Sequence, residues 1–228
     1  AFVAVTMCAA SWVADSPQSV VDMGGGRGSL SDFEAWYSRL ATTFFYFTNS
    51  SNLIVAITCL LLAIRLNRSS ALFRVFRLYS LIAIIITGLV YNFYIAQVHP
   101  SSGFNLVINI LLHSVVPVMS VGGWLAFGPR TPFRFSYLLG SVSIGLVWLV
   151  ITLSRGAIIH WYPYPFLDAG SIGLGDAIRN CSAVLICALL IGLAILGLDT
   201  LLPPRASRRQ PSAVDPTSPD HGRQLPRR

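Results

Sequence analysis

Long apolar runs constrain this chain more than any other feature of its sequence. A helix needs about 20 residues to cross the hydrocarbon core of a membrane, and five runs are long enough. They cover roughly residues 42–66, 72–97, 104–127, 135–154 and 177–202. A sixth run, 1–14, would span only about 21 Å as a helix, and we interpret it as the outer part of a first helix. We therefore expect an all-α, polytopic integral membrane bundle of about six transmembrane helices, with the first one short or partial.

The composition agrees with a membrane protein and argues against other classes. Hydrophobic residues make up 54% of the 228 residues and charged residues only 11%, whereas soluble domains carry about 25% charged residues. This excludes a disordered chain and argues against a soluble globular enzyme. The four cysteines form no CxxC pair and all lie in apolar runs, which supports neither a zinc site nor a disulfide framework. We expect no metal and no cofactor.

The arginines indicate how the chain is oriented. All 16 basic residues are arginine; twelve lie in one set of loops and four in the alternating set. The first set comprises 65–77, 128–134 and 203–228, and the second comprises 15–39, 98–103 and 155–179. Because cytoplasmic loops are enriched in basic residues, we expect the first set and the C-terminus to be cytoplasmic.

The net charge of +7 is therefore a signal of topology, and we expect no nucleic-acid partner. Residues 203–228 are rich in Pro, Ser and Arg, which is typical of a disordered basic tail following a transmembrane domain at 1–202. The absence of lysine is typical of a GC-rich bacterial genome, so we expect a location in the bacterial cytoplasmic membrane. The sequence leaves the oligomeric state open.

Polar side chains gather in the outer halves of three predicted helices. Such residues are costly in a membrane and usually face the interior of the bundle. The group comprises Thr48 and Asn52 in 42–66, Tyr91 and Asn92 in 72–97, and Asn109 and His113 in 104–127. The spacing of four between Asn109 and His113 places both on one helical face. We expect a polar pocket that opens towards the outer face of the membrane.

The predicted outer loop 155–168 follows the fifth apolar run and is rich in aromatic residues. Its two prolines and its aromatic cluster fit either an ordered lid over the pocket or a simple interfacial belt. Arg155 fits a partner for a substrate carboxylate or an anchor to lipid headgroups. We include Arg155, His160 and Trp161 among the candidate substrate-binding residues, together with Asn52, Asn109, Tyr91 and Asn92.

Each polar residue also has a structural explanation. His113 fits a general base that works near neutral pH, or a packing residue bonded to a neighbouring helix. A threonine such as Thr48 usually bonds the carbonyl four residues earlier in its own helix. Asn52 and Asn109 are suited to stabilising an oxyanion or to holding helices together. A haem site would require a second helical histidine facing His113, and the sequence has none.

Three segments resemble one family of membrane proteins. They are FTNSSNLIV at 47–55, LLHSVVPV at 111–118 and RGAIIHWYPYPFLD at 155–168. Together they resemble the androgen-induced-gene family, and most closely its bacterial six-helix branch. Characterised members hydrolyse fatty acid esters of hydroxy fatty acids. The resemblance implies a threonine nucleophile at Thr48 and a histidine base at His113.

These observations predict a membrane-embedded hydrolase that acts on a membrane lipid or fatty acid ester. A third group that orients His113 is expected from the logic of catalytic triads. Asp168 and Asp176 lie in the predicted outer loop region, so Asn109 is an equal candidate for this role. The alternatives are a non-catalytic carrier of a lipid or small molecule that uses the same pocket, and a structural or assembly subunit whose arginine-rich tail recruits a partner or anionic lipid.

Overall fold

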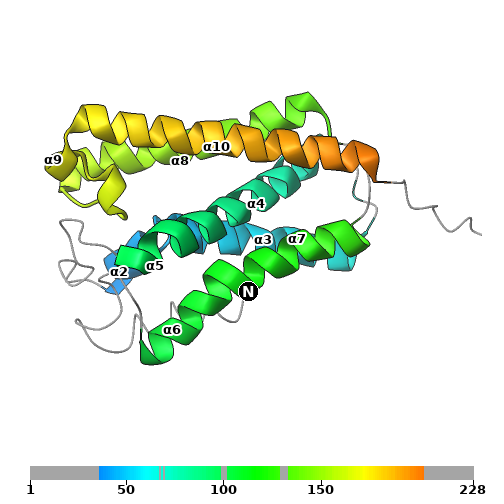
Figure 1. Cartoon of the computed structure of the whole chain (residues 1–228), viewed down its shortest axis with the longest axis horizontal. Coiled ribbons are helices and arrows are strands. Elements are labelled where there is room, and N and C mark those ends of the chain that lie inside the picture. The colour runs from blue at the N-terminus through cyan, green and yellow to red at the C-terminus, as the bar shows by residue number, and fades with distance from the viewer. Residues whose placement is uncertain (1–35, 67, 69, 99–101, 129–132, 203–228) are drawn as a thin grey trace, which may run out of the picture.

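A computed structural model describes residues 36–66, 68, 70–98, 102–128 and 133–202, and within these residues the chain is helical (Figure 1). The α-helices are α2 (Trp36–Thr43), α3 (Phe47–Ile64), α4 (Ala71–Val90), α5 (Ala96–Val98), α6 (Gly103–Ile110), α7 (Val116–Phe127), α8 (Phe135–Ile159), α9 (Ala169–Ile172) and α10 (Leu174–Leu201). Two short segments, η2 (Tyr91–Ile95) and η3 (Leu111–Val115), are π-helical, and η4 (Pro165–Leu167) is a 3-10 turn. The predicted first helix at 1–14 and the predicted tail at 203–228 lie outside the described residues.

Five helices are long and apolar enough to cross a membrane, as the sequence predicted. They span Phe47–Ile64, Ala71–Ile95, Asn105–Phe127, Phe135–Ile159 and Leu174–Leu201. The clearest difference concerns the predicted helix 42–66, which is broken at its start. The chain turns after α2, and Tyr46 adopts an extended conformation before α3 begins at Phe47. Thr48 is therefore the second residue of its helix and does not lie six residues inside it.

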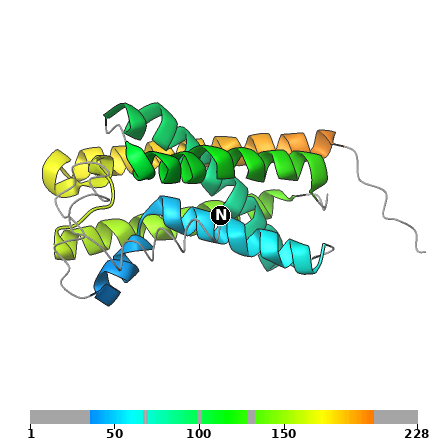
Figure 2. The same ribbon diagram turned by 90° about the horizontal axis from the view of Figure 1, so that it is seen from below.

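Helix α4 forms the centre of the bundle. It packs against α3, α7, α8 and α10 (Figures 1 and 2), and Leu78, Leu81 and Ile84 on it are completely buried. Over its membrane-length window 61% of the residues are buried, against 17–33% for the other four long helices. Those four helices expose large apolar side chains such as Leu60 and Val118.

Small hydroxyl residues connect α3 to α4. Ser51 Oγ lies 2.8 Å from Thr87 Oγ1, and Thr58 Oγ1 donates to Ser80 Oγ at 3.3 Å. All four side chains are buried, and hydrogen bonds of this kind hold helices together where the surroundings are apolar. The two antiparallel helices thus have a fixed register, in which Thr48 lies beside the end of α4.

The segment after α8 folds back over one end of the bundle and is buried there. Trp161, Tyr162 and Tyr164 are each no more than 6% exposed and pack in one cluster with Tyr46. The Tyr162 ring lies where a side chain on Gly156 would be, because a Cβ at that position would approach the ring to 2.1 Å. This part of the loop is an ordered part of the core and does not form an exposed aromatic belt.

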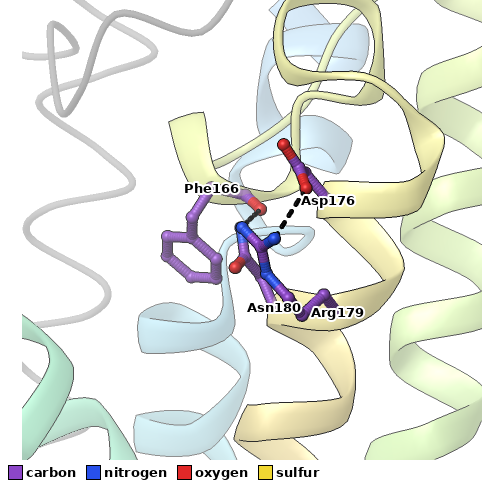
Figure 3. Close-up of polar contacts among 4 residues, drawn as sticks. All are labelled: Phe166, Asp176, Arg179 and Asn180. Atoms are coloured by element: carbon purple, nitrogen blue, oxygen red, sulfur yellow. Dashed lines mark hydrogen bonds and ion pairs between the residues drawn. The ribbon is translucent and has the colours of Figure 1, made fainter.

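Helix α10 fixes the other side of this loop. Asn180 Nδ2 donates to the main-chain oxygen of Phe166 at 2.9 Å, next to an exposed ion pair between Asp176 and Arg179 (Figure 3). The Asp168 carboxylate accepts hydrogen bonds from the main chain of Gly170 and Ser171 and so caps α9. The loop that contains Tyr164 is therefore held from both α8 and α10.

Candidate functional site

The two residues with predicted catalytic roles meet inside the bundle. Thr48, at the start of α3, has its Oγ1 3.1 Å from Nε2 of His113 in η3. Their side chains are 7% and 2% exposed, respectively. The distance is within the hydrogen-bond range that a nucleophile and its general base require. The sequence prediction that these side chains share a pocket is therefore consistent with the geometry.

The contact of the other ring nitrogen, Nδ1, determines whether Thr48 or His113 is the donor in the hydrogen bond between them. Nδ1 lies 3.0 Å from the main-chain oxygen of Asn109, and a carbonyl oxygen can only accept. Nδ1 must then carry the proton, which leaves the lone pair of Nε2 to accept from the Thr48 hydroxyl. The orienting group is thus the main chain of Asn109, whereas the carboxylate of Asp168 caps α9.

Asn52 connects α3, which carries Thr48, to η3, which carries His113. Its side chain is completely buried, and Nδ2 donates to the main-chain oxygens of Thr48 at 2.8 Å and Leu112 at 3.3 Å. Both donor hydrogens are used in these contacts, and Asn52 is not among the residues that line the main cavity. The amide therefore holds the backbone of Thr48 beside that of Leu112, the residue before His113.

Both π-helical segments of the bundle lie at this site. The Tyr91 ring in η2 stacks on the imidazole of His113 in η3, with centroids 3.8 Å apart and planes 17° from parallel. A π-bulge inserts one residue into a helical turn and is often found at functional sites, because it re-aims side chains. The Tyr91 ring packs against one face of the imidazole, and the Asn109 carbonyl accepts a hydrogen bond from Nδ1 at its edge.

A proline and an asparagine hold the backbone of the histidine. Pro117 has no N–H to donate to the carbonyl of His113, four residues earlier. Asn92 Nδ2 donates to that oxygen at 3.0 Å and to the carbonyl of Gly88 at 2.8 Å. A Cβ on Gly88 would lie 3.1 Å from the same His113 oxygen, so the close approach of α4 to η3 requires glycine there.

Tyr164 is a site residue that the sequence analysis did not select. Its hydroxyl lies 3.5 Å from Thr48 Oγ1 and accepts from the Thr48 main-chain N–H at 3.3 Å. That N–H is one of the four at the start of a helix that have no partner within the helix. Burial raises the pKa of the Tyr164 phenol, although hydrogen bonds from Thr48 and Phe47 partly oppose this. The phenol is therefore protonated at neutral pH and has a proton to donate.

A long apolar cavity opens from the Thr48–His113 pair. About 740 Å³ of space without atoms, part of it open to the surroundings, lies between α3, α4, α8, α10 and the loop. Along η2 and α4 the lining runs from Ile95 to Tyr79, which corresponds to about 24 Å of helix. Thr48, His113 and Tyr164 bring polar groups together on a wall that is otherwise largely apolar.

Of the predicted substrate-binding residues, Tyr91 lines this cavity and the others do not. Arg155 donates to Thr42 Oγ1 at 2.8 Å and lies over the rings of Phe45 and Trp161. His160 is exposed, with a left-handed φ of 55° at the end of α8, and Trp161 belongs to the aromatic cluster. These three residues therefore lie at one end of the bundle and do not line the cavity.

Tyr164 could have been suspected from its neighbours. It lies between Pro163 and Pro165, and a residue before proline is restricted to extended conformations.

Among the described residues, no group of three or more His, Cys, Asp or Glu is placed to hold a metal ion. Comparisons with protein-family models, with curated proteins and with solved structures find no match to the chain.

Proposed function

We propose that this protein is an integral membrane hydrolase that cleaves long-chain fatty acid esters, with Thr48 as nucleophile and His113 as general base. The observation that carries the proposal is the 3.1 Å contact between Thr48 Oγ1 and His113 Nε2 on the wall of a long apolar cavity. The resemblance to the bacterial branch of the androgen-induced-gene family is part of the same proposal.

The proposed setting is a lipid bilayer, and it rests on the surface of the bundle. Five helices have the length and apolar character to span a membrane, and their outward faces carry exposed side chains such as Leu190 and Phe127. Soluble proteins rarely expose apolar patches of this extent. With the arginine-rich loops in the cytoplasm, the Thr48–His113 site would lie towards the outer face of the bacterial cytoplasmic membrane.

In the first half of the reaction, Thr48 Oγ attacks the ester carbonyl carbon while His113 Nε2 takes the hydroxyl proton. The Asn109 carbonyl, bonded to Nδ1–H, favours the imidazolium that forms. The negative charge that develops on the carbonyl oxygen is stabilised by a donated hydrogen bond from the Tyr164 hydroxyl. The intermediate then collapses, the bond to the alcohol oxygen breaks, and His113 returns the proton to that oxygen.

The second half releases the fatty acid. The acyl group is now held as an ester on Thr48, and His113 Nε2 is again unprotonated. It takes a proton from water as the water oxygen attacks the acyl carbon. The bond to Thr48 Oγ breaks, and the proton on His113 returns to the threonine. A carboxylic acid leaves, and the starting state of both residues is restored.

The decisive experiment is turnover of a fluorogenic long-chain fatty acid ester by the purified full chain. Thr48→Ala and His113→Ala are expected to abolish turnover while leaving expression and thermal unfolding nearly unchanged. Thr58→Ala is the matched control, because Thr58 is a buried threonine on the same helix that does not line the cavity. Retained activity in either site variant would refute the assignment.

Covalent labelling separates hydrolysis from simple binding. A fluorophosphonate that reacts with activated serine and threonine hydroxyls is expected to label the unsubstituted protein and not Thr48→Ala. A carrier would instead retain lipid in the cavity with neither turnover nor labelling. That pair of results would replace the hydrolase proposal with the non-catalytic alternative.

A further inference from the structure

A second cavity, lined by three arginines, lies among the ends of α3, α4 and α7. The space without atoms there is about 330 Å³, and part of it is open to the surroundings. Its lining consists of Leu62, Arg68, Phe73, Arg74, Arg77, Trp124 and Phe133. Arg77 and Thr87 are separated along α4 by about 15 Å at the helical rise, and Thr87 lines the first cavity beside Thr48. The arginine cavity is therefore separate from the proposed catalytic site.

Among the residues that the structure describes, no carboxylate pairs with the buried Arg77. Its side chain is 8% exposed. Its Nη1 contacts the Cys59 sulfur at 3.8 Å, and a thiol sulfur is a weak acceptor. The ion pair found among the described residues joins Asp176 and Arg179 and does not involve Arg77. A buried guanidinium normally has a carboxylate or phosphate partner, because an unpaired buried charge is costly.

The neighbouring arginines leave further donors available. Arg74 Nε is buried and makes no hydrogen bond, and the Arg74 guanidinium lies over the Tyr137 ring at 5.8 Å. Arg68 uses Nε to bond the main-chain oxygen of Leu61 at 2.9 Å. Neither contact supplies a negative charge.

One described acid, Asp199, contacts a residue that lines this cavity. Asp199 on α10 accepts from the main-chain N–H of Phe133 at 2.9 Å, and Phe133 lines the cavity. Its carboxylate is not within ion-pair distance of Arg68, Arg74 or Arg77. Three arginines therefore line one cavity, and within the described part of the chain none of them is paired with a carboxylate.

We propose that this cavity binds the phosphate group of an anionic membrane lipid. A phosphate has several oxygens that match the planar donor array of arginine, and it would supply the missing charge to Arg77. The adjoining surface of α3 and α4 is apolar, with Leu60, Ile64 and Leu72 exposed, so acyl chains can lie against it. Juxtamembrane arginines attract anionic lipids, but here one of them is buried in a cavity.

The test measures thermal unfolding of the full chain, purified in dodecyl maltoside, with three added probes. Dioctanoyl phosphatidylglycerol is expected to raise the midpoint of unfolding in a saturable way, and dioctanoyl phosphatidylcholine to raise it much less. Inorganic phosphate distinguishes a free anion from a lipid: an equal shift at equal concentration would assign the cavity to free phosphate and overturn the lipid proposal.

Variants locate the effect. Arg74→Gln and Arg77→Gln are expected to weaken the apparent affinity for phosphatidylglycerol at least tenfold. Arg65→Gln removes the same charge from an exposed arginine at the end of α3 and is expected to change the affinity less than twofold. Equal weakening in all three variants would mean that only the general positive charge matters, which refutes a built site.

Arg77→Met covers the case in which the glutamine variants fold poorly. If Arg77 has no partner when lipid is absent, replacing it with an apolar side chain does not lower the lipid-free midpoint, and the shift caused by phosphatidylglycerol is lost. A lower lipid-free midpoint together with an undiminished lipid shift would show that Arg77 has a purely structural role. Ester turnover plays no part in these measurements, so their outcome is independent of the proposed hydrolase activity.

Discussion

At the scale of single residues, the arrangement around Thr48 is a chain of polar groups with one direction. The Tyr164 hydroxyl, the Thr48 hydroxyl, the His113 ring and the Asn109 carbonyl follow one another at 3.5, 3.1 and 3.0 Å. Because the Asn109 carbonyl can only accept, each group in this series donates its proton to the next one in the direction of Asn109. This leaves the Tyr164 proton facing the Thr48 oxygen, where the carbonyl oxygen of a bound ester would arrive.

Tyr164→Phe tests the proposed stabilisation of the oxyanion. Removing one such donor typically lowers kcat about 10²- to 10³-fold, and we expect a loss of this size with little change in KM. Ester turnover by the purified variant measures it. Tyr162→Phe is the control, since Tyr162 is a buried tyrosine of the same loop that does not line the cavity. Equal kcat in the two variants would remove Tyr164 from the mechanism.

Asn92 acts on the base through the backbone. Asn92→Leu removes the hydrogen bonds to the carbonyls of Gly88 and His113. The His113 carbonyl cannot bond to the residue four positions later instead, because Pro117 has no N–H. Losing one such bond costs about 1–3 kcal/mol when an acceptor is left buried. We expect a lower unfolding midpoint and a reduced kcat. An unchanged midpoint would show that water replaces the amide.

At the scale of helices, the position of His113 depends on how closely α4 approaches η3. Gly88→Ala places a Cβ 3.1 Å from the His113 oxygen and 3.3 Å from Pro117 Cβ, so the segments must separate. Such overpacking costs about 1–3 kcal/mol, and the shift would also lengthen the Thr48–His113 contact and lower kcat. Gly123→Ala on α7 is the control, because a Cβ there meets nothing within 4 Å. Full activity in Gly88→Ala would contradict this account.

The sequence predicted the long helices well and their irregularities poorly. Apolar length alone identifies five spans, because a membrane-length helix needs little else. The turn before Phe47 lies inside an apolar run, so hydropathy gives no sign of it. The π-helical segments at Tyr91 and His113 are also invisible to a search for helical periodicity, since they depend on tertiary contacts such as the stack between these two rings.

The pairing of Thr48 with His113 could be predicted from the positions of these residues in their helices and from the family resemblance. The place of Tyr164 beside Thr48 could not be predicted from the sequence. It lies 116 residues from Thr48 along the chain, and its place depends on how the loop folds onto α8 and α10. The same limit explains the orienting group of His113. A main-chain carbonyl is present at every residue, and only the geometry of η3 selects that of Asn109.

At the scale of the whole molecule, the proposed hydrolase activity implies that the cavity limits the length of the substrate. The register between α3 and α4 puts Thr48 beside Val90, and the cavity continues along α4 to Tyr79, about 16 Å further by helical rise. Ser141 and Gly145 of α8 line the same region as Tyr79. Helices α4 and α8 therefore limit how far an acyl chain bound at Thr48 can extend.

Gly145→Leu tests this limit. A Cβ on Gly145 would lie 3.9 Å from the Tyr79 ring, in ordinary contact, so the variant is expected to fold while its longer side chain occupies the far part of the cavity. We expect kcat/KM for a long-chain ester to fall at least tenfold and that for a butyryl ester to stay within twofold. Gly197→Leu is the control, because a Cβ on Gly197 meets nothing within 4 Å. An unchanged kcat/KM for the long-chain ester would mean that the acyl chain leaves the site by another route, through the lipid-facing side of the bundle. Equal losses on both esters would mean that the substitution disturbs the site as a whole, and either result would contradict chain-length selection by the cavity.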